Sequence, residues 1–338
     1  MISSRWRRGK AAACACHHGF VAGPCAAPAA PGPPPLPEVA KLSDKVIRVL
    51  GRNPSPFALT GTNLYLVGTG VSRILIDAGE GKPGVLEDLL RTMSAEGCRE
   101  LSQLVITHWH YDHLLGVPEI LRHFGDELPV RKYMPVQGTA SGELENVEGA
   151  WSPLEFLSNI AIQELVDGET LTCEGATLTV LHTPGHANDH VCLFLEEEKA
   201  LFTGDNVLGW GTGTFQDLQQ YMRSLKLMAA QAPGVLYPAH GPVISGASEV
   251  SAWLQMYITH REERIQQVED ELQSAGSGLD LVDLVRRVYQ AQPHVLESEG
   301  LFRGACLNTK RVLDFLSHAG RLRQEGRMYV WTPGASRL

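Results

Sequence analysis

Short apolar runs alternate with amphipathic stretches from Lys41 to about residue 246. Apolar runs that end in polar clusters are typical of buried strands, and apolar residues spaced three and four apart are typical of helices. This pattern predicts strands over 64–67, 74–76, 104–106, 178–181, 191–195, 201–202 and 235–237. It predicts helices over 85–93, 119–124 and 218–230. We therefore expect a layered, mixed α/β domain over residues 41–247.

The pattern changes after Gly246, where a long charged helix is predicted over 248–274. A break over 274–278 and two further helical patterns follow it. A helix over 307–318 is then followed by two short strands, 321–323 and 328–331, joined by a turn over 324–326. A helix followed by a hairpin is similar to a small winged-helix module. We therefore expect a second, helical domain with such a module over 248–338.

Four side chains that can bind a metal lie within six residues, directly after the expected strand 104–106. They are His108, His110, Asp112 and His113. In an extended chain or loop, side chains two apart point the same way, so His108 and His110 can share one ion while Asp112 and His113 turn toward a second. Neutral imidazoles and one carboxylate suit Zn²⁺ with an open position for water. The cluster favours a metal site, because buried polar groups without partners are costly.

The same placement at the end of a strand recurs three times. The strand over 178–181 leads into His182 and His186, the strand over 201–202 into Asp205, and the strand over 235–237 into His240. Glycine and proline beside these side chains permit tight turns and stiffen the approach. One such histidine is a weak signal, but the order of all four segments is specific.

This order of residues resembles a known family, the metallo-β-lactamase superfamily. The series that carries the resemblance is His108-x-His110-x-Asp112-His113, followed by His186, Asp205 and His240, and Asp77 matches the first acidic motif of the family. The resemblance covers roughly residues 42–245. Within the superfamily it points to the branch of mitochondrial endoribonucleases, whose carboxy-terminal extension is similar to the expected second domain.

The resemblance implies an αββα sandwich with two zinc ions at one edge of the sheets. His108, His110 and His186 would hold the first ion, Asp112, His113 and His240 would hold the second, and Asp205 would bridge them. Asp77 and His182 would not bind an ion themselves. They would contact the ligands as outer hydrogen-bond partners, which orient ligating histidines. Asp112 and Asp205 would orient the metals and a water. The proton for the leaving group would come from His190, from His182 or from a metal-bound water, and the sequence does not choose among them.

A pair of zinc ions lowers the pKa of a shared water and so supplies hydroxide near pH 7. The predicted function is a zinc-dependent endoribonuclease that cleaves single-stranded RNA with this hydroxide. The alternative is a thioesterase, or a glyoxalase II-like thioester hydrolase, because one such site serves several substrate classes. Glyoxalase II normally has Gly-His-Glu where this chain has Ala239-His240-Gly241. The 34 residues between Asp205 and His240 are too few for the insertion of a β-CASP nuclease.

Two further alternatives fit the ligand set less well. An iron dioxygenase of this fold would use one metal, whereas the residues for two sites are present. A binding module without catalysis is disfavoured because none of the seven expected ligands is missing.

Composition and charge narrow the functional classes. The chain is 43% hydrophobic and 20% charged, and no apolar run approaches the ~20 residues that span a bilayer, which excludes a membrane-embedded protein. Residues 38–255 hold 14 basic and 27 acidic side chains, a poor surface for attracting RNA. Residues 301–338 hold seven basic and two acidic side chains. We therefore expect Arg321, Arg323 and Arg327 to supply much of the contact if RNA binds.

The first 37 residues contain Arg5, Arg7, Arg8 and Lys10 but no acidic side chain. A basic, alanine-rich start without a continuous apolar core is typical of a mitochondrial transit peptide. We expect residues 1–40 to be a transit peptide and a Pro/Ala-rich linker, and the protein to reach the mitochondrial matrix, with a cytoplasmic location as the alternative. A homo-oligomer is compatible with the sequence.

Overall fold

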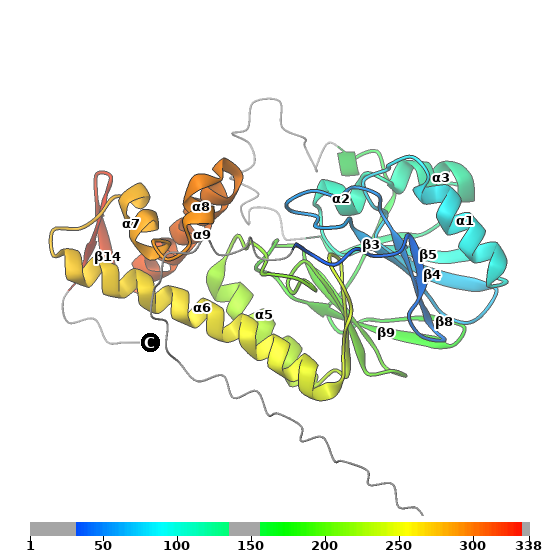
Figure 1. Cartoon of the computed structure of the whole chain (residues 1–338). Helices are drawn as coiled ribbons and strands as arrows, with labels where there is room; N and C mark the ends of the chain where they lie inside the picture. Colours follow the sequence, from blue (N-terminus) through cyan, green and yellow to red (C-terminus); the bar gives the residue numbers. More distant parts are fainter. Residues whose placement is uncertain (1–31, 135–155, 333–338) are drawn as a thin grey trace, which may run out of the picture. The chain divides into compact units, whose positions relative to one another are not determined.

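Two β-sheets pack face to face, and helices cover their outer faces (Figure 1). This computed structural model describes residues 32–134 and 156–332. Most of the expected transit peptide and linker lies outside these residues and stays a prediction.

The first sheet contains seven strands that follow one another in sequence order. They are β1 (Val39–Lys41), β2 (Val46–Leu50), β3 (Asn63–Val67), β4 (Ser72–Ile76), β5 (Glu100–Ile106), β6 (Val130–Lys132) and β7 (Ile162–Glu164). Strands β1 to β4 pair antiparallel, and β4 to β7 pair parallel. Parallel pairs need crossover connections. Those on either side of β5 carry α1 (Val85–Ala95), and α2 (Tyr111–Leu114) with α3 (Val117–Phe124).

The second sheet contains six strands in the order β13-β12-β11-β10-β9-β8. They are β8 (Thr170–Cys173), β9 (Ala176–His182), β10 (Val191–Leu195), β11 (Ala200–Gly204), β12 (Val235–Pro238) and β13 (Ile244–Ser245). Only β11 and β12 pair parallel among these strands, and α5 (Leu218–Ala230) connects them. All the strands and helices predicted over 41–247 fall inside observed elements.

Alternation of side chains along the strands separates the layers of the core. In β3, Tyr65 and Val67 enter the core between the two sheets, whereas Leu64 and Leu66 pack toward α1 and α3. The outer face of the second sheet packs on α5 and on α6 (Ala247–Ala275). The expected αββα sandwich is therefore confirmed.

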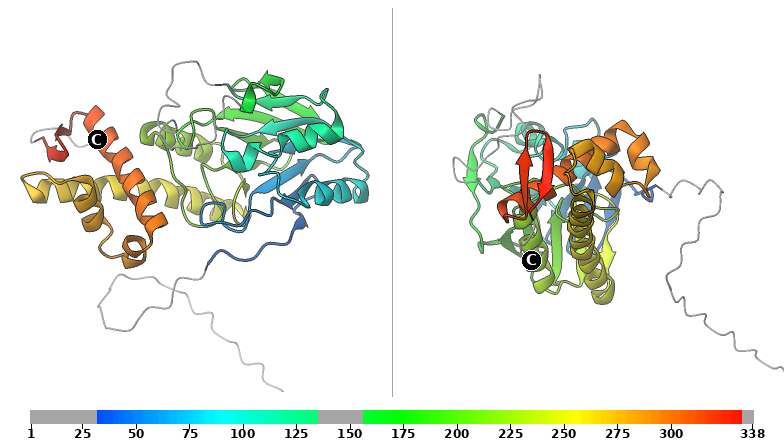
Figure 2. Two further views of the ribbon diagram at one scale, coloured as in Figure 1. Left: turned by 90° about the horizontal axis from the view of Figure 1, so that it is seen from above. Right: turned by 90° about the vertical axis from the view of Figure 1, so that its left-hand side faces the viewer.

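The C-terminal region is helical and continues from α6. It contains α7 (Leu281–Val288), α8 (Pro293–Glu297), α9 (Glu299–His318) and the hairpin of β14 (Leu322–Glu325) and β15 (Met328–Trp331). One end of α6 contacts the second sheet at β12 and β13, and the other contacts α7, α9 and β15 (Figure 2). The predicted helix and hairpin are present, but α9 begins earlier than residue 307 because its first turns pack on α7 and α8. Among the described residues, no helix is both long and apolar enough to cross a bilayer.

The expected basic surface on the hairpin is wrong at its first residue. Arg321 is only 3% exposed, forms an ion pair with Glu269 of α6 at 2.5 Å, and lies over the Trp331 ring. Arg323 is exposed but pairs with Glu325. A guanidinium that is buried against a carboxylate cannot contact a phosphate backbone, so the expected RNA contact loses one of its three arginines.

Candidate metal centre

The four ends of β5, β9, β11 and β12 meet at one edge of the two sheets. After these strand ends the chain continues into loops or, after β5, into a short loop and the helix α2. His108 is fully buried in the turn, His110 precedes α2, and Asp112 and His113 lie in its first turn. The second sheet contributes His186, Asp205 and His240 from the loops after its strands. The structure thus brings together all seven residues expected to bind metal.

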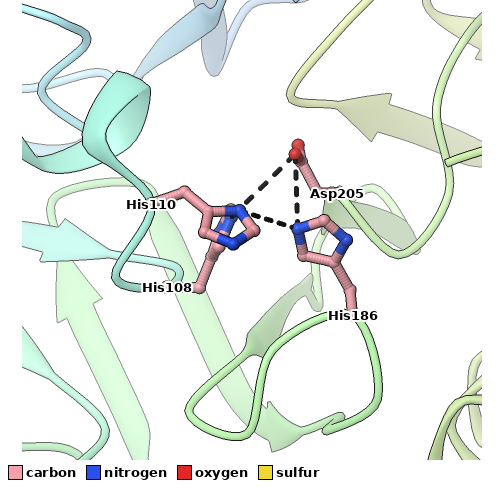
Figure 3. Close-up of side chains that lie close together, drawn as sticks. All are labelled: His108, His110, His186 and Asp205. Atoms are coloured by element: carbon pink, nitrogen blue, oxygen red, sulfur yellow. Dashed lines mark hydrogen bonds and ion pairs between the residues drawn. The ribbon is translucent and has the colours of Figure 1, made fainter. Parts of the chain in front are cut away.

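Three histidines and one aspartate form a first ligand group (Figure 3). His110 Nδ1 lies 2.8 Å from His108 Nε2 and 2.9 Å from His186 Nε2. Asp205 Oδ2 lies 3.5 Å from His186 Nε2 and 3.9 Å from His108 Nε2. These ligand atoms all lie within 4.8 Å of one another, so they can share one ion.

Asp112, His113 and His240 form a second ligand group beside the first. His240 Nε2 lies 3.2 Å from Asp112 Oδ2, and His113 Nε2 lies 3.6 Å from the same oxygen. Asp205 also faces this group, because its Oδ1 lies 3.2 Å from His240 Nε2 and 3.5 Å from His113 Nε2. One carboxylate therefore presents one oxygen to each group.

Two buried atoms test whether a cation fits here. His113 Nε2 and Asp205 Oδ1 are buried, and neither makes a hydrogen bond to any residue that the structure describes. Buried polar atoms in folded proteins nearly always have partners. An ion between the groups would satisfy both atoms, and imidazoles with carboxylates are the donor set that zinc accepts. The residues present fit a metal centre.

The two groups differ in the charge of their histidines. Burial and the neighbouring imidazoles lower the pKa of His108 well below its usual value, and burial lowers that of His110 to about 3. Burial also acts on His240, but Asp205 and Asp112 outweigh it and raise the pKa to about 10. The carboxylates around His113 raise its pKa in the same way. Without an ion, the second group therefore holds protons that a cation would replace.

Asp77 lies behind the ligands, where the sequence placed it. It follows β4 with a left-handed backbone, at a φ of 62°. Its carboxylate accepts hydrogen bonds from Thr107 N at 2.8 Å and Thr107 Oγ1 at 3.0 Å, and lies 2.8 Å from His113 Nδ1. Asp77 thereby fixes the ring of His113 and the start of the loop after β5.

His190 does not have the place expected of a proton donor. It is fully buried, and its Nε2 accepts a hydrogen bond from the backbone N–H of Asp205 at 3.1 Å. Its Nδ1 lies 3.0 Å from Thr183 Oγ1. Because Nε2 must be unprotonated to accept, and burial holds the pKa of the ring well below its usual value, His190 supports the Asp205 backbone and does not face a substrate.

His182 lies at the end of β9 and flanks the site. Its ring stacks on Tyr133 at 3.9 Å, and its Nε2 lies 3.0 Å from the carbonyl oxygen of Asn188. Since a carbonyl only accepts, that nitrogen carries a proton held by the protein. His182 therefore holds the loop before His190 and is not positioned as an outer partner of a ligand.

Two supporting interactions were missed in the sequence. Thr62 Oγ1 donates to Asp112 Oδ2 at 3.3 Å and accepts from Asn53. Lys132 of β6 and Asp189 are both buried and form an ion pair that links the first sheet to the loop of His186. A lysine in a strand and an aspartate between two histidines are each ordinary in sequence, so only the fold reveals the pair.

Comparison with known proteins places this site in a family. The family model described as "Metallo-beta-lactamase superfamily" matches residues 58–240, a span that contains all seven ligand residues. The chain belongs to the metallo-β-lactamase superfamily. Two solved members of this fold cover most of the chain. A family protein from Thermus thermophilus covers 88% of this chain and 99% of its own, with a TM-score of 0.63 and 22% identity. A beta-lactamase domain protein from Burkholderia ambifaria covers 87% and 93%, with a TM-score of 0.67 and 19% identity.

Curated relatives within the superfamily are more similar in sequence. "Lactamase-like protein aptB" of Emericella nidulans is 42% identical over 248 residues, 72% of each chain. "Atrochrysone carboxyl ACP thioesterase" of Aspergillus chevalieri is 39% identical over 275 residues, 79% of this chain and 80% of its own. The protein of that name in Aspergillus fumigatus is 39% identical over 235 residues, 70% and 67% of the two chains.

These relatives correct one expectation from the sequence. The branch of mitochondrial endoribonucleases, represented by beta-lactamase-like protein 2, was expected to be the most similar. The relatives at about 40% identity instead carry lactamase-like and ACP thioesterase names. The ligand motif identified the superfamily but not the branch.

Proposed function

We propose that this protein is a metal-dependent hydrolase of acyl thioesters, with an acyl group attached to a carrier protein as its substrate. The observation that carries the proposal is the 39% identity, over 79% of this chain, to an ACP thioesterase. The two adjacent ligand groups supply a site suited to such a hydrolysis. The function is thus the alternative that the sequence left open.

The residues that would hold two zinc ions are those of the two ligand groups, with Asp205 facing both. When bound, such a pair lowers the pKa of a water toward neutrality and polarises a carbonyl oxygen. The chain itself orients the ligands. Asp77 holds the His113 ring, Thr62 holds the Asp112 carboxylate, and His190 holds the backbone of Asp205.

The bond changes in thioester hydrolysis suit this arrangement. The oxygen of a water adds to the acyl carbon while the water gives one proton to solvent, the carbon–sulfur bond breaks, and the sulfur leaves with the bonding electron pair. A thiol has a pKa of about 8.5, so the thiolate can leave before it takes a proton from solvent. A ribose oxygen leaves as an alkoxide with a conjugate acid near the pKa of water, about 16, and needs more help.

The expected protein acids do not supply that help. His190 Nε2 is unprotonated and buried, and His182 Nε2 already donates to the Asn188 carbonyl. A site without a free proton donor at these two positions supports a thioester more than a phosphodiester.

The test is a substrate panel on the full chain loaded with zinc. We would measure hydrolysis of an acyl-ACP thioester, the same acyl group on coenzyme A, single-stranded RNA and a cephalosporin. We expect thioester turnover that a chelator abolishes and that Asp205→Asn removes. The control is Asp44→Asn, which changes an exposed aspartate outside both ligand groups.

Two outcomes would overturn the proposal. RNA cleavage without thioester turnover would return the protein to the endoribonuclease prediction. Two bound zinc ions without hydrolysis of either thioester would show that the site serves another substrate class.

A further inference from the structure

Three side chains on one face of α6 bind the loop that follows Asp205. Trp253, Tyr257 and Arg261 are spaced four residues apart, so they lie on one side of the helix. Trp253 Nε1 donates to the Leu208 carbonyl at 2.9 Å, Tyr257 Oη to the Gly211 carbonyl at 2.9 Å, and Arg261 Nη2 to the Gly213 carbonyl at 2.6 Å. Tyr257 Oη also accepts from Leu208 N at 2.8 Å. Helix α6 thereby binds the carbonyl groups of Leu208, Gly211 and Gly213. All three lie in this loop, which comprises residues 206–216.

The same loop contacts the metal ligands. Its residue Thr214 offers its carbonyl oxygen to His186 Nδ1 at 2.8 Å. Gly209 N donates to the carbonyl oxygen of His240 at 2.8 Å, and the loop begins directly after Asp205. A hydrogen bond to the outer nitrogen of a ligating histidine sets its tautomer and ring direction. The loop therefore lies between α6 and three ligand residues.

Composition explains why this loop needs support from outside. Gly209, Gly211 and Gly213 alternate within five residues, and glycine gives the backbone the widest freedom. Glycine is required at 209, because an added Cβ would lie 1.9 Å from the Pro242 carbonyl oxygen. A larger residue at position 209 would restrict the backbone, but it does not fit. The position of the loop therefore depends on the residues that it packs against.

Arg261 is the support nearest to His186. Its side chain is buried, and its guanidinium lies over the rings of Phe215 at 4.9 Å and Tyr221 at 5.5 Å. It binds Gly213, the neighbour of Thr214. This stacking leaves the guanidinium little freedom, so the carbonyl next to the His186 partner is held firmly.

We propose that Arg261 is a positioning residue for the metal centre and that α6 sets the orientation of His186 through residues 206–216. Helix α6 thereby supports the metal centre, although none of its residues belongs to either ligand group. The proposal rests on the metal-binding part of the proposed function and not on the thioester as substrate.

The test compares two arginines of the same helix in the full chain. Arg261→Met removes the hydrogen bond to the loop, and Arg261→Lys keeps a charge and one donor. Arg264→Met is the matched control, because Arg264 is also buried but stacks on Tyr289 at 4.0 Å and binds Val288. Zinc affinity is measured by chelator competition, and the ligand field by the visible spectrum of the cobalt-loaded protein. Thermal melting reports whether each variant folds.

We expect Arg261→Met to lose about 10- to 100-fold in zinc affinity at the first ligand group, which contains His186, and to shift the cobalt bands. Arg261→Lys should recover part of the loss, and Arg264→Met should bind as the unaltered chain does at a similar melting temperature. If Arg261→Met does not fold, Tyr257→Phe gives the second measurement, with a smaller loss in the same direction.

Unchanged zinc affinity and cobalt bands in Arg261→Met would overturn the inference, as would an equal loss in Arg264→Met. Failure of the unaltered chain to bind zinc would instead overturn the metal site of the proposed function. The two failures are therefore distinguishable.

Discussion

The metal centre and the C-terminal region both bury charged side chains, but they balance the charge differently. In the C-terminal region, Arg321 and Glu269 form a buried pair of opposite charges. At the metal centre, Asp77, Asp112 and Asp205 pair with histidines, and among the described residues no lysine or arginine forms an ion pair with these three carboxylates. A buried carboxylate that is paired with an arginine has a permanent counter-charge, whereas carboxylates that are paired only with protonated histidines can exchange those protons for a cation.

The largest effect should follow Asp205→Asn. The amide keeps the shape of the side chain but removes the negative charge that faces both ligand groups. We expect thioester hydrolysis to fall by about 10³-fold or more, roughly 4 kcal/mol of transition-state stabilisation, with the fold retained. Steady-state kinetics and metal analysis would check this. A fully active variant would contradict the assignment of two ions.

Breaking the buried pair of the C-terminal region should affect stability and leave the ligand groups intact. We expect Glu269→Gln to lower the free energy of unfolding by about 3 kcal/mol, because Arg321 stays buried without its counter-charge. The double variant Glu269→Gln, Arg321→Met should recover part of that loss. Urea denaturation measures the stability, and zinc content is the control. A loss of zinc in the single variant would show that the two regions are not separable in this way.

Removing the metal should destabilise the metal centre and leave the C-terminal region largely unchanged. An ion at 100 times its dissociation constant stabilises the folded state by about 2.7 kcal/mol. On chelation, we expect faster hydrogen exchange in the loops after β5, β9 and β11 and little change in α9 and the β14–β15 hairpin. Equal loss of protection in both regions would contradict a local metal site.

The smallest effect concerns His260, which is half-buried on α6 beside two arginines. Burial first, and then Arg261 and Arg264, lower its pKa to about 4. Between pH 6.5 and 4 the ring of His260 is protonated in the unfolded chain but not in the folded chain. The free energy of unfolding therefore falls as the pH falls. Since the ring is partly exposed, we expect a contribution below ~1 kcal/mol. His260→Gln should flatten the pH dependence of chemical denaturation in this window, and an unchanged slope would contradict the lowered pKa.

The sequence predicted the sandwich and the meeting of the seven expected ligand residues, because both leave local signals. Buried strands appear as apolar runs, and each ligand directly follows one of them. His108, His186, Asp205 and His240 could be placed at one edge because strand ends meet there. The strands that were not predicted are β1, β2, β6, β7, β8 and β13. Five of these six have four residues or fewer, and in β2 the apolar run is interrupted by Arg48.

The roles of other residues depend on contacts between distant segments. His190 looked like a proton donor until the fold placed it behind the Asp205 backbone. Arg321 looked like a surface cation until α6 supplied Glu269. The substrate class could not be predicted from the ligand residues either, because one such metal site serves several substrate classes.

We expect two metal ions in the two ligand groups to support thioester hydrolysis. The most direct test is the rate of acyl-ACP hydrolysis as zinc is added back to the chelated full-length chain. We predict that the rate rises from near zero and reaches its plateau at two zinc ions per chain. Hydrolysis at full rate without metal, or a plateau at one ion, would show that the reaction does not need two metal ions.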